Sequence, residues 1–129
     1  MDPAHFRREL SAALDPVLVP VGFAAGQFGG TQAIFCAEHD TFSDRFPHLP
    51  PANEQERGAG CCVDVDVDVD AADRMEVQVE GWPLAEVVHA AGLGHRARRR
   101  AAALTTASPA SFAELADLLA AVFRGPSGR

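Results

Sequence analysis

The 129-residue sequence contains no lysine and no tyrosine, and only three of its residues are cysteine. Three cysteines, two of them adjacent, do not supply the paired framework of a disulfide-rich secreted domain. No apolar run approaches the roughly 20 residues that a membrane-spanning helix requires. The N-terminus also lacks the basic-then-apolar pattern of a signal peptide. We therefore expect a cytoplasmic protein with reduced thiols and no membrane partner.

Positive charge is also scarce: the sequence has 11 arginines and 18 acidic residues, so its net charge is −7. The imbalance is concentrated in the middle of the chain, where residues 38–80 hold 12 acidic residues and 3 arginines. Residues 81–129 reverse it, with 6 arginines and 3 acidic residues. Phosphate backbones require a basic face, so we predict no nucleic-acid partner. A basic protein is the partner that this charge would attract.

The most regular pattern in the chain is the strict alternation of valine and aspartate from Val63 to Asp70. A period of two predicts a strand whose valines face a core and whose aspartates face the other way. The aspartates then lie roughly 7 Å apart, given a rise of about 3.3 Å per residue. After a turn at 71–73 the alternation resumes from Arg74 to Glu80, which predicts an antiparallel hairpin.

The length and the 47% hydrophobic content predict one α+β domain spanning 1–129. We expect an antiparallel sheet of about four strands in meander order, with an N-terminal helix and two or three C-terminal helices packed on it. The first two strands are predicted at 21–28 and 31–38, joined at Gly29-Gly30. Residues 40–59 are expected to form a long mobile loop and 125–129 a disordered tail.

Helix boundaries follow from capping residues and prolines. Asp2-Pro3 is suited to begin the first helix, and Asp15-Pro16 is expected to interrupt it. Later helices are expected at 84–91, at 95–104 and from a capping box that begins at Ser111.

The candidate site combines the acidic strand surface with the arginine-rich segment His95–Arg100. If that segment is helical, its arginines can reach either the acidic edge of the same chain or a carboxylate on another protein. The predicted partner-binding residues are Asp64, Asp66, Asp68, Asp70, Glu76, Glu80, Arg96, Arg99 and Arg100.

Clustered carboxylates can also hold divalent cations, so a small metal-dependent enzyme or nucleotide-handling protein is an alternative. A calcium-binding loop does not fit, because counting from Asp64 places Val69 where glycine is needed and Met75 where glutamate is needed. The cysteine and histidine spacings do not match a zinc site. We therefore predict no catalytic residue, metal ligand or cofactor. The sequence does not decide whether the protein is an enzyme, and it favours a non-enzymatic function.

The order of elements resembles small α+β domains found among bacterial toxin-immunity proteins and related uncharacterised bacterial domains. A leading helix runs through Leu14-Asp15-Pro16 into Val21-Gly22-Phe23, and two hairpins and closing helices follow. The resemblance covers most of the chain in outline and rests on no specific motif. It implies a non-enzymatic protein that binds and blocks a cognate toxin through an acidic surface. A further alternative is a homodimeric structural domain, in which the aspartates meet the arginines of a second copy.

Overall fold

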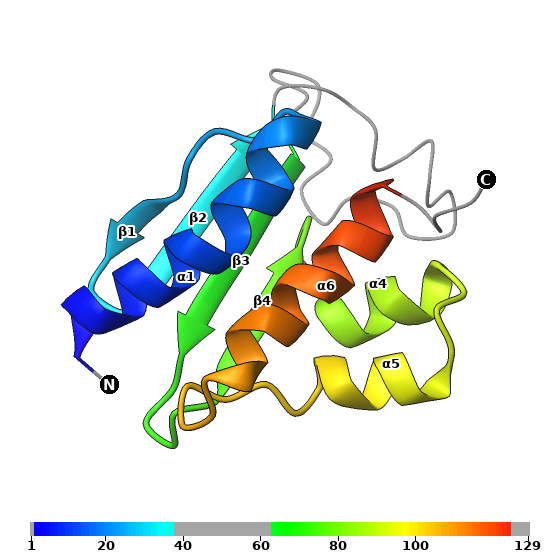
Figure 1. The fold of residues 1–129 in the computed structure, drawn as a ribbon. Helices are drawn as coiled ribbons and strands as arrows, with labels where there is room; N and C mark the ends of the chain where they lie inside the picture. The colour runs from blue at the N-terminus through cyan, green and yellow to red at the C-terminus, as the bar shows by residue number, and fades with distance from the viewer. Residues whose placement is uncertain (1, 38–62, 125–129) are drawn as a thin grey trace.

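The computed structural model describes residues 2–37 and 63–124 of the chain (Figure 1). The strands are β1 (Gln27–Gly29), β2 (Gln32–Ala37), β3 (Val63–Val69), β4 (Met75–Val79) and β5 (Trp82–Pro83). The helices are α1 (Pro3–Leu18), the 3-10 helix η1 (Val19–Val21), α4 (Leu84–Ala90), α5 (His95–Ala101) and α6 (Ala110–Arg124). The loop expected at 40–59 and the tail expected at 125–129 lie outside the described residues.

The five strands form one sheet in the order β1-β2-β3-β4-β5, and each strand is antiparallel to its neighbour. The predicted α+β meander, with an N-terminal helix and C-terminal helices, is thus confirmed. The two-residue β5 adds one short strand to the expected four. The Val/Asp strand β3 is central, and it pairs with β2 on one side and with β4 on the other.

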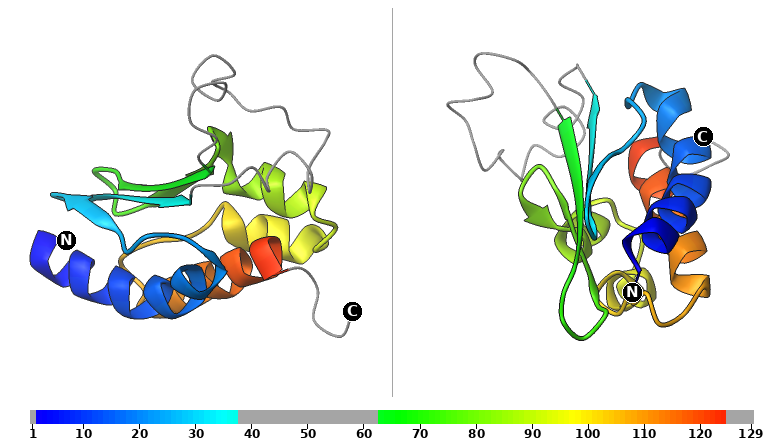
Figure 2. Two further views of the ribbon diagram at one scale, coloured as in Figure 1. Left: turned by 90° about the horizontal axis from the view of Figure 1, so that it is seen from above. Right: turned by 90° about the vertical axis from the view of Figure 1, so that its left-hand side faces the viewer.

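Helices α1 and α6 lie on one side of the sheet and run side by side across it, and α4 and α5 continue beyond β4 and β5 (Figure 1). The view from above shows the sheet in one layer and α1 and α6 in a second (Figure 2). None of the described helices covers the opposite face of the sheet, so the two faces have different surroundings.

Alternation along the strands decides which side chains enter the core. From the sheet the core takes Ala33, Phe35, Ala37, Val63, Val65, Val67, Met75, Val77 and Val79. From α1 it takes Phe6, Leu10, Leu14 and Leu18, and α6 adds Leu115, Leu119 and Val122. The predicted inward direction of the valines of β3 and of the apolar residues of β4 is therefore confirmed.

Helix α1 begins as predicted and ends later than predicted. The Asp2 side chain accepts a hydrogen bond of 3.1 Å from the backbone N–H of His5, which caps the helix. The expected break at Asp15-Pro16 is wrong, because the helix continues through Pro16 to Leu18. A proline inside a helix costs about 3 kcal/mol. Full burial of Leu18 stabilises the folded state by about 1.5–3 kcal/mol, which offsets this cost.

The first hairpin differs from its prediction in position. The two-residue turn is Gly30-Thr31, one residue later than expected, because Gly29 pairs with Gln32. Gly30 has φ 64°, a left-handed conformation that glycine adopts without strain. The strand expected at 21–28 is reduced to β1, since η1 occupies Val19–Val21 and only an isolated bridge forms at Phe23.

The C-terminal helices also differ in their bounds. Helix α5 ends at Ala101, earlier than the predicted 104. The capping box expected at Ser111 is wrong, because α6 already begins at Ala110. The Ser111 hydroxyl instead accepts a hydrogen bond of 3.2 Å from the backbone N–H of Thr105. A serine beside a helix start can therefore fix the preceding segment rather than cap the helix.

Replacing Gly26 by alanine is expected to destabilise the fold. A Cβ atom at this position would lie 2.7 Å from Cε1 and Cζ of the fully buried Phe35 ring. Overpacking of this kind costs about 1–3 kcal/mol in the free energy of unfolding, which urea denaturation measures. Gly29→Ala is the control, because no atom lies within 4 Å of its added Cβ. Equal losses in both variants would contradict the packing argument.

Candidate functional site: the acidic face of the sheet

The sheet face opposite the helices carries most of the predicted carboxylates. We call it the acidic face and define it by Gln32, Ile34, Cys36, Asp64, Asp66, Asp68, Glu76 and Gln78. These residues alternate with the core residues of β2, β3 and β4, so the same pattern that buries the valines turns the aspartates outward.

Strand register arranges the acidic face in rows. In one row Asp66 lies between Ile34 and Gln78, and in the next Asp68 lies between Gln32 and Glu76. Asp68 and Glu76 are therefore like charges on directly opposite positions, an arrangement that destabilises a sheet by about 0.2–1 kcal/mol. The sheet retains this repulsion even though a neutral residue at either position would remove it.

Asp64 has a specific neighbour on the adjacent strand. The Cys36 thiol donates a hydrogen bond of 2.7 Å from Sγ to Oδ1 of Asp64. Cys36 is exposed, because alternation along β2 places it on the acidic face. Cys61 and Cys62 lie outside the described residues.

The surroundings of Asp66, at the centre of the face, alter its protonation. Partial burial between the neighbouring strands raises the pKa of Asp66 above its usual 3.8, and the negative charge of Asp64 raises it further. Both causes disfavour the carboxylate form. Ionisation of Asp66 therefore costs free energy in the folded protein when no partner is bound.

A shallow depression of about 250 Å³ lies at the middle of the acidic face. The outward-facing residues that line it are Gln32, Ile34, Asp66, Asp68, Glu76 and Gln78. Ile34 is 45% exposed, and Val19 is the other large apolar side chain with comparable exposure in the described part of the chain. An apolar side chain thus lies among carboxylates and amides.

Two of the predicted carboxylates lie in turns rather than on the strands. Asp70 follows β3, and its Oδ1 accepts hydrogen bonds from the backbone N–H groups of Ala72 at 2.8 Å and Arg74 at 3.0 Å. Its role is thus to close the β3–β4 turn. Glu80 occupies the β4–β5 turn with φ 54°. The structure brings together Asp64, Asp66, Asp68 and Glu76 out of the six predicted acids.

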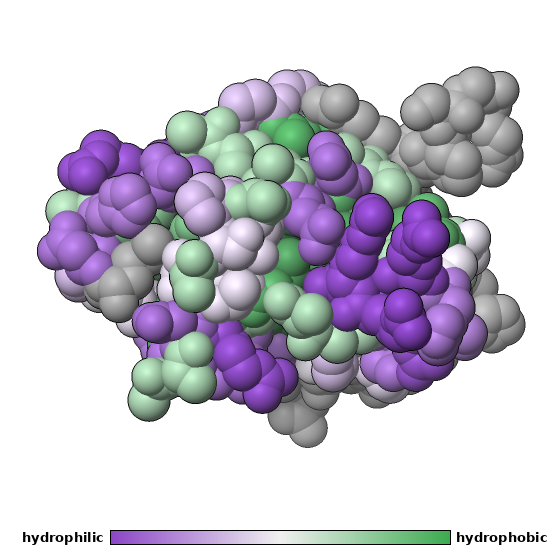
Figure 3. All heavy atoms as spheres, turned by 60° about the horizontal axis from the view of Figure 1, so that its bottom comes forward, coloured by the Kyte–Doolittle hydropathy of each residue, from purple (hydrophilic) through white to green (hydrophobic). Residues whose placement is uncertain are grey.

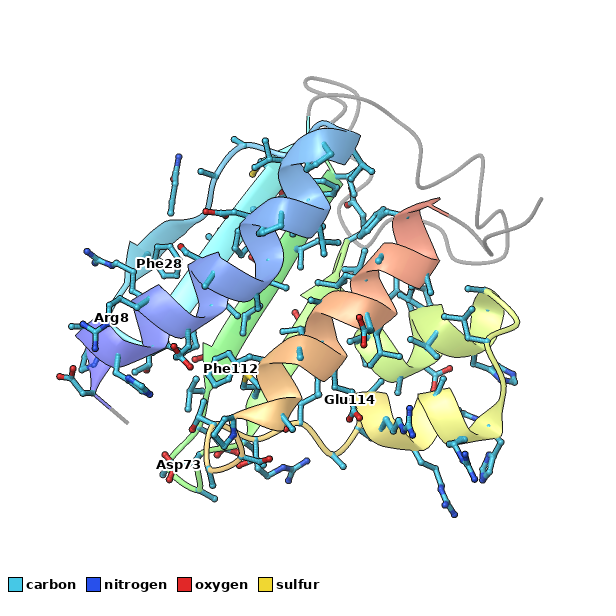
Figure 4. The ribbon with its side chains drawn as sticks, viewed as in Figure 1. Arg8, Phe28, Asp73, Phe112 and Glu114 are labelled. Atoms are coloured by element: carbon cyan, nitrogen blue, oxygen red, sulfur yellow. The ribbon has the colours of Figure 1, made fainter. Side chains whose placement is uncertain are left out.

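The predicted arginines do not meet the aspartates. Helix α5 packs mainly against α4 and α6, and its hydrophilic side chains gather in one region of the surface (Figure 3). Arg100 Nε lies 3.7 Å from Glu114 Oε2 of α6, and Figure 4 shows Glu114 on the side of α6 near α5. Arg96 and Arg99 are exposed.

One ion pair of α5 involves an arginine that the sequence analysis did not select. Arg98 Nη2 donates to Glu86 Oε1 of α4 at 2.8 Å. No described arginine forms an ion pair with Asp64, Asp66, Asp68 or Glu76. Arg74, two residues before Glu76, is exposed, but like the other described arginines it forms no ion pair with these four carboxylates.

The partner-binding residues predicted from the sequence do not include Gln32, Ile34 and Gln78, which the structure places on the acidic face. The alternation of 31–38 already groups Gln32, Ile34 and Cys36 on one side of a strand. Only the strand order could show that this group lies beside the aspartates, because β2 and β3 are far apart in the sequence.

The geometry does not support a metal centre. Within residues 2–37 and 63–124, no three side chains of histidine, cysteine, aspartate or glutamate come close enough to hold a metal ion. The cause is the extended strand, which separates successive outward carboxylates by roughly 7 Å.

Comparisons with protein-family models, with curated proteins and with solved structures find no match for this chain. None of the helices in the described ranges is long and apolar enough to cross a membrane. The candidate function must therefore come from the chemistry of the site.

Replacing Asp66 by asparagine is expected to stabilise the protein near neutral pH. Because the folded-state pKa is raised, the folded state binds the proton more tightly than the unfolded chain, and stability falls as pH rises through that pKa. Asparagine cannot ionise, so the variant avoids this fall in stability. We expect its free energy of unfolding to be higher by about 0.2–1 kcal/mol, the range for a partly exposed group. The gain should shrink toward pH 3.8 and below, where Asp66 is increasingly protonated in both states.

Urea denaturation of both proteins across this pH range measures the effect. The control is Asp117→Asn, which removes one negative charge from the exposed surface of α6. If the two variants gave the same pH-dependent gain, the effect would come from net charge and not from the surroundings of Asp66.

Proposed function

We propose that this protein is a non-enzymatic binding module that uses the acidic face to hold a basic surface of another protein. The observation that carries the proposal is the group Asp64, Asp66, Asp68 and Glu76, which is held together without an ion-pair partner among the described arginines. A basic partner would relieve the repulsion between Asp68 and Glu76 and would favour the ionised form of Asp66.

The centre of the face supports this proposal. Protein interfaces combine an apolar centre with a polar rim, and here the exposed Ile34 lies in a depression lined by carboxylates and amides. Burial of Ile34 would contribute affinity that does not depend on salt, whereas the carboxylates would contribute orientation and association rate. The cognate toxin implied by the resemblance to immunity proteins is one partner of this kind.

A second copy of the chain is the alternative partner, because Arg96 and Arg99 of α5 are exposed. A dimer formed by aspartates of one copy and arginines of the other would dissociate as salt is raised. Sedimentation at two salt concentrations separates this alternative from binding of a different protein.

Reversing charge on the acidic face is expected to weaken partner binding. The variant is Asp66→Arg, Asp68→Arg, which places two positive charges at the centre of the face. We expect the affinity for a captured partner to fall by about tenfold or more, equivalent to about 1.4 kcal/mol or more. The measurement is affinity capture from an extract of the producing cells, followed by titration of the captured protein.

The matched control is Glu9→Arg, Asp117→Arg, which makes the same change in net charge on α1 and α6. The proposal requires that the control retain the partner and that the partner carry a basic surface. Capture of the same proteins by the wild type and both variants would refute it.

A further inference from the structure

A second hollow, a groove of about 310 Å³, lies at the outer edge of β4. Its walls come from β4, from the start of α4 and from the end of α5. The strand positions at both ends of this edge are filled, because Pro83 pairs with Gln78 and the carbonyl of Leu104 accepts the N–H of Met75 at 3.0 Å. The groove therefore has no room for another strand. Its volume lies at the lower end of the range of about 300–1,000 Å³ for small-molecule sites.

The deep part of the groove is apolar. Val77, Leu84 and Ala101 line it and are 6%, 2% and 7% exposed. Ala85 and Ala102 also line it, and their methyl side chains leave space beside Val77. Burial of an aliphatic group against these side chains would be favourable, because it removes apolar surface from water.

The rim of the groove carries one positive and one negative side chain. Arg74 and Glu76 both line the groove and are exposed. They are two residues apart on β4, so they project on the same side of the strand at a separation of roughly 7 Å. Neither side chain forms an ion pair with the other or with any residue in the described ranges. Both charges are therefore available to a ligand.

Opposite charges on one rim favour a ligand that carries both signs. A simple carboxylate would be attracted by Arg74 and repelled by Glu76, and a simple amine would meet the reverse. Glu76 lies opposite Asp68, so negative charge at this end of the rim favours an ammonium group. The guanidinium of Arg74 offers parallel N–H donors, which match the two oxygens of a carboxylate.

We propose that this groove binds a free amino acid with an aliphatic side chain. Arg74 donates hydrogen bonds to the carboxylate of the ligand, and the ammonium group of the ligand donates to the carboxylate of Glu76. The aliphatic side chain lies against Val77, Leu84 and Ala101. The two charged groups of an amino acid are bonded to one carbon, and the long, flexible side chain of arginine spans the remaining separation along the rim.

The probe is L-leucine, titrated into the isotopically labelled protein and followed by amide NMR. We expect saturable shifts of the amide signals of Val77, Ala85 and Ala102. Two analogues each remove one charged group and keep the aliphatic part: 4-methylpentanoate lacks the ammonium group, and 3-methylbutylamine lacks the carboxylate. Each should bind more weakly than L-leucine by about tenfold, because one charged hydrogen-bonding partner is left unpaired.

Two protein variants assign the charged groups of the ligand to the rim. Arg74→Gln should bind L-leucine no better than 3-methylbutylamine, and Glu76→Gln should bind L-leucine no better than 4-methylpentanoate. The matched controls are Arg8→Gln on α1, where Figure 4 shows Arg8, and Asp117→Asn on α6. Both controls should keep the wild-type affinity and the preference for L-leucine.

A third variant tests the apolar part of the groove without changing charge. Ala102→Phe places a ring at an exposed residue of the groove wall and should block L-leucine, whereas Ala12→Phe makes the same change on the exposed side of α1 and should not. Equal binding to both variants, equal affinity for the three ligands, or no saturable binding to the wild type would each overturn the inference.

The proposed amino-acid site is separate from partner binding by the acidic face, although Glu76 lines both hollows. Arg74→Gln keeps all the carboxylates of the acidic face, so it should lose its preference for L-leucine and still retain the protein partner. Failure of the wild type to bind L-leucine would refute the amino-acid site and leave the proposed function standing.

Discussion

The register of β3 in the centre of the sheet is the constraint on which the rest of the structure depends. Val63, Val65 and Val67 are almost fully buried against the helices, while Asp64, Asp66 and Asp68 lie on the opposite face. A slip of one residue would exchange the two sets. Exposing each valine would lose about 1.5–3 kcal/mol of burial free energy. Burying the aspartates without partners would cost several kcal/mol each. The hydrophobic effect on one face thus dictates the charge pattern on the other.

The same constraint accounts for the charge of the acidic face. Because the helices cover the core side or extend beyond β4 and β5, Arg98 and Arg100 of α5 pair with Glu86 and Glu114, away from the aspartates of β3. The acidic face therefore keeps its charge. At the other edge the chain leaves the sheet at Pro83 to begin α4, so no described helix crosses to the side of the aspartates.

Patterns that reside in consecutive residues were predicted well. The β3–β4 hairpin, its inward valines and the start of α1 at Asp2-Pro3 follow from alternation and capping, which are local properties. Pro16 was misjudged because its cost is local, whereas the burial of Leu18 that offsets it depends on the sheet and α6. Pro16 and Ala12, which lies one turn before it, are both exposed on α1, and the proline has no N–H to donate within the helix.

The sequence by itself determined the fold class, the division of β3 into an apolar and an acidic side, and the excess of negative charge in the middle of the chain. Each of these depends on side-chain type and on the two-residue period of a strand. The tertiary structure decided which residues share the acidic face, and that Arg98 and Arg100 of α5 pair with Glu86 and Glu114 instead of the aspartates. Those outcomes depend on strand order and helix placement, which bring together residues that the linear sequence separates.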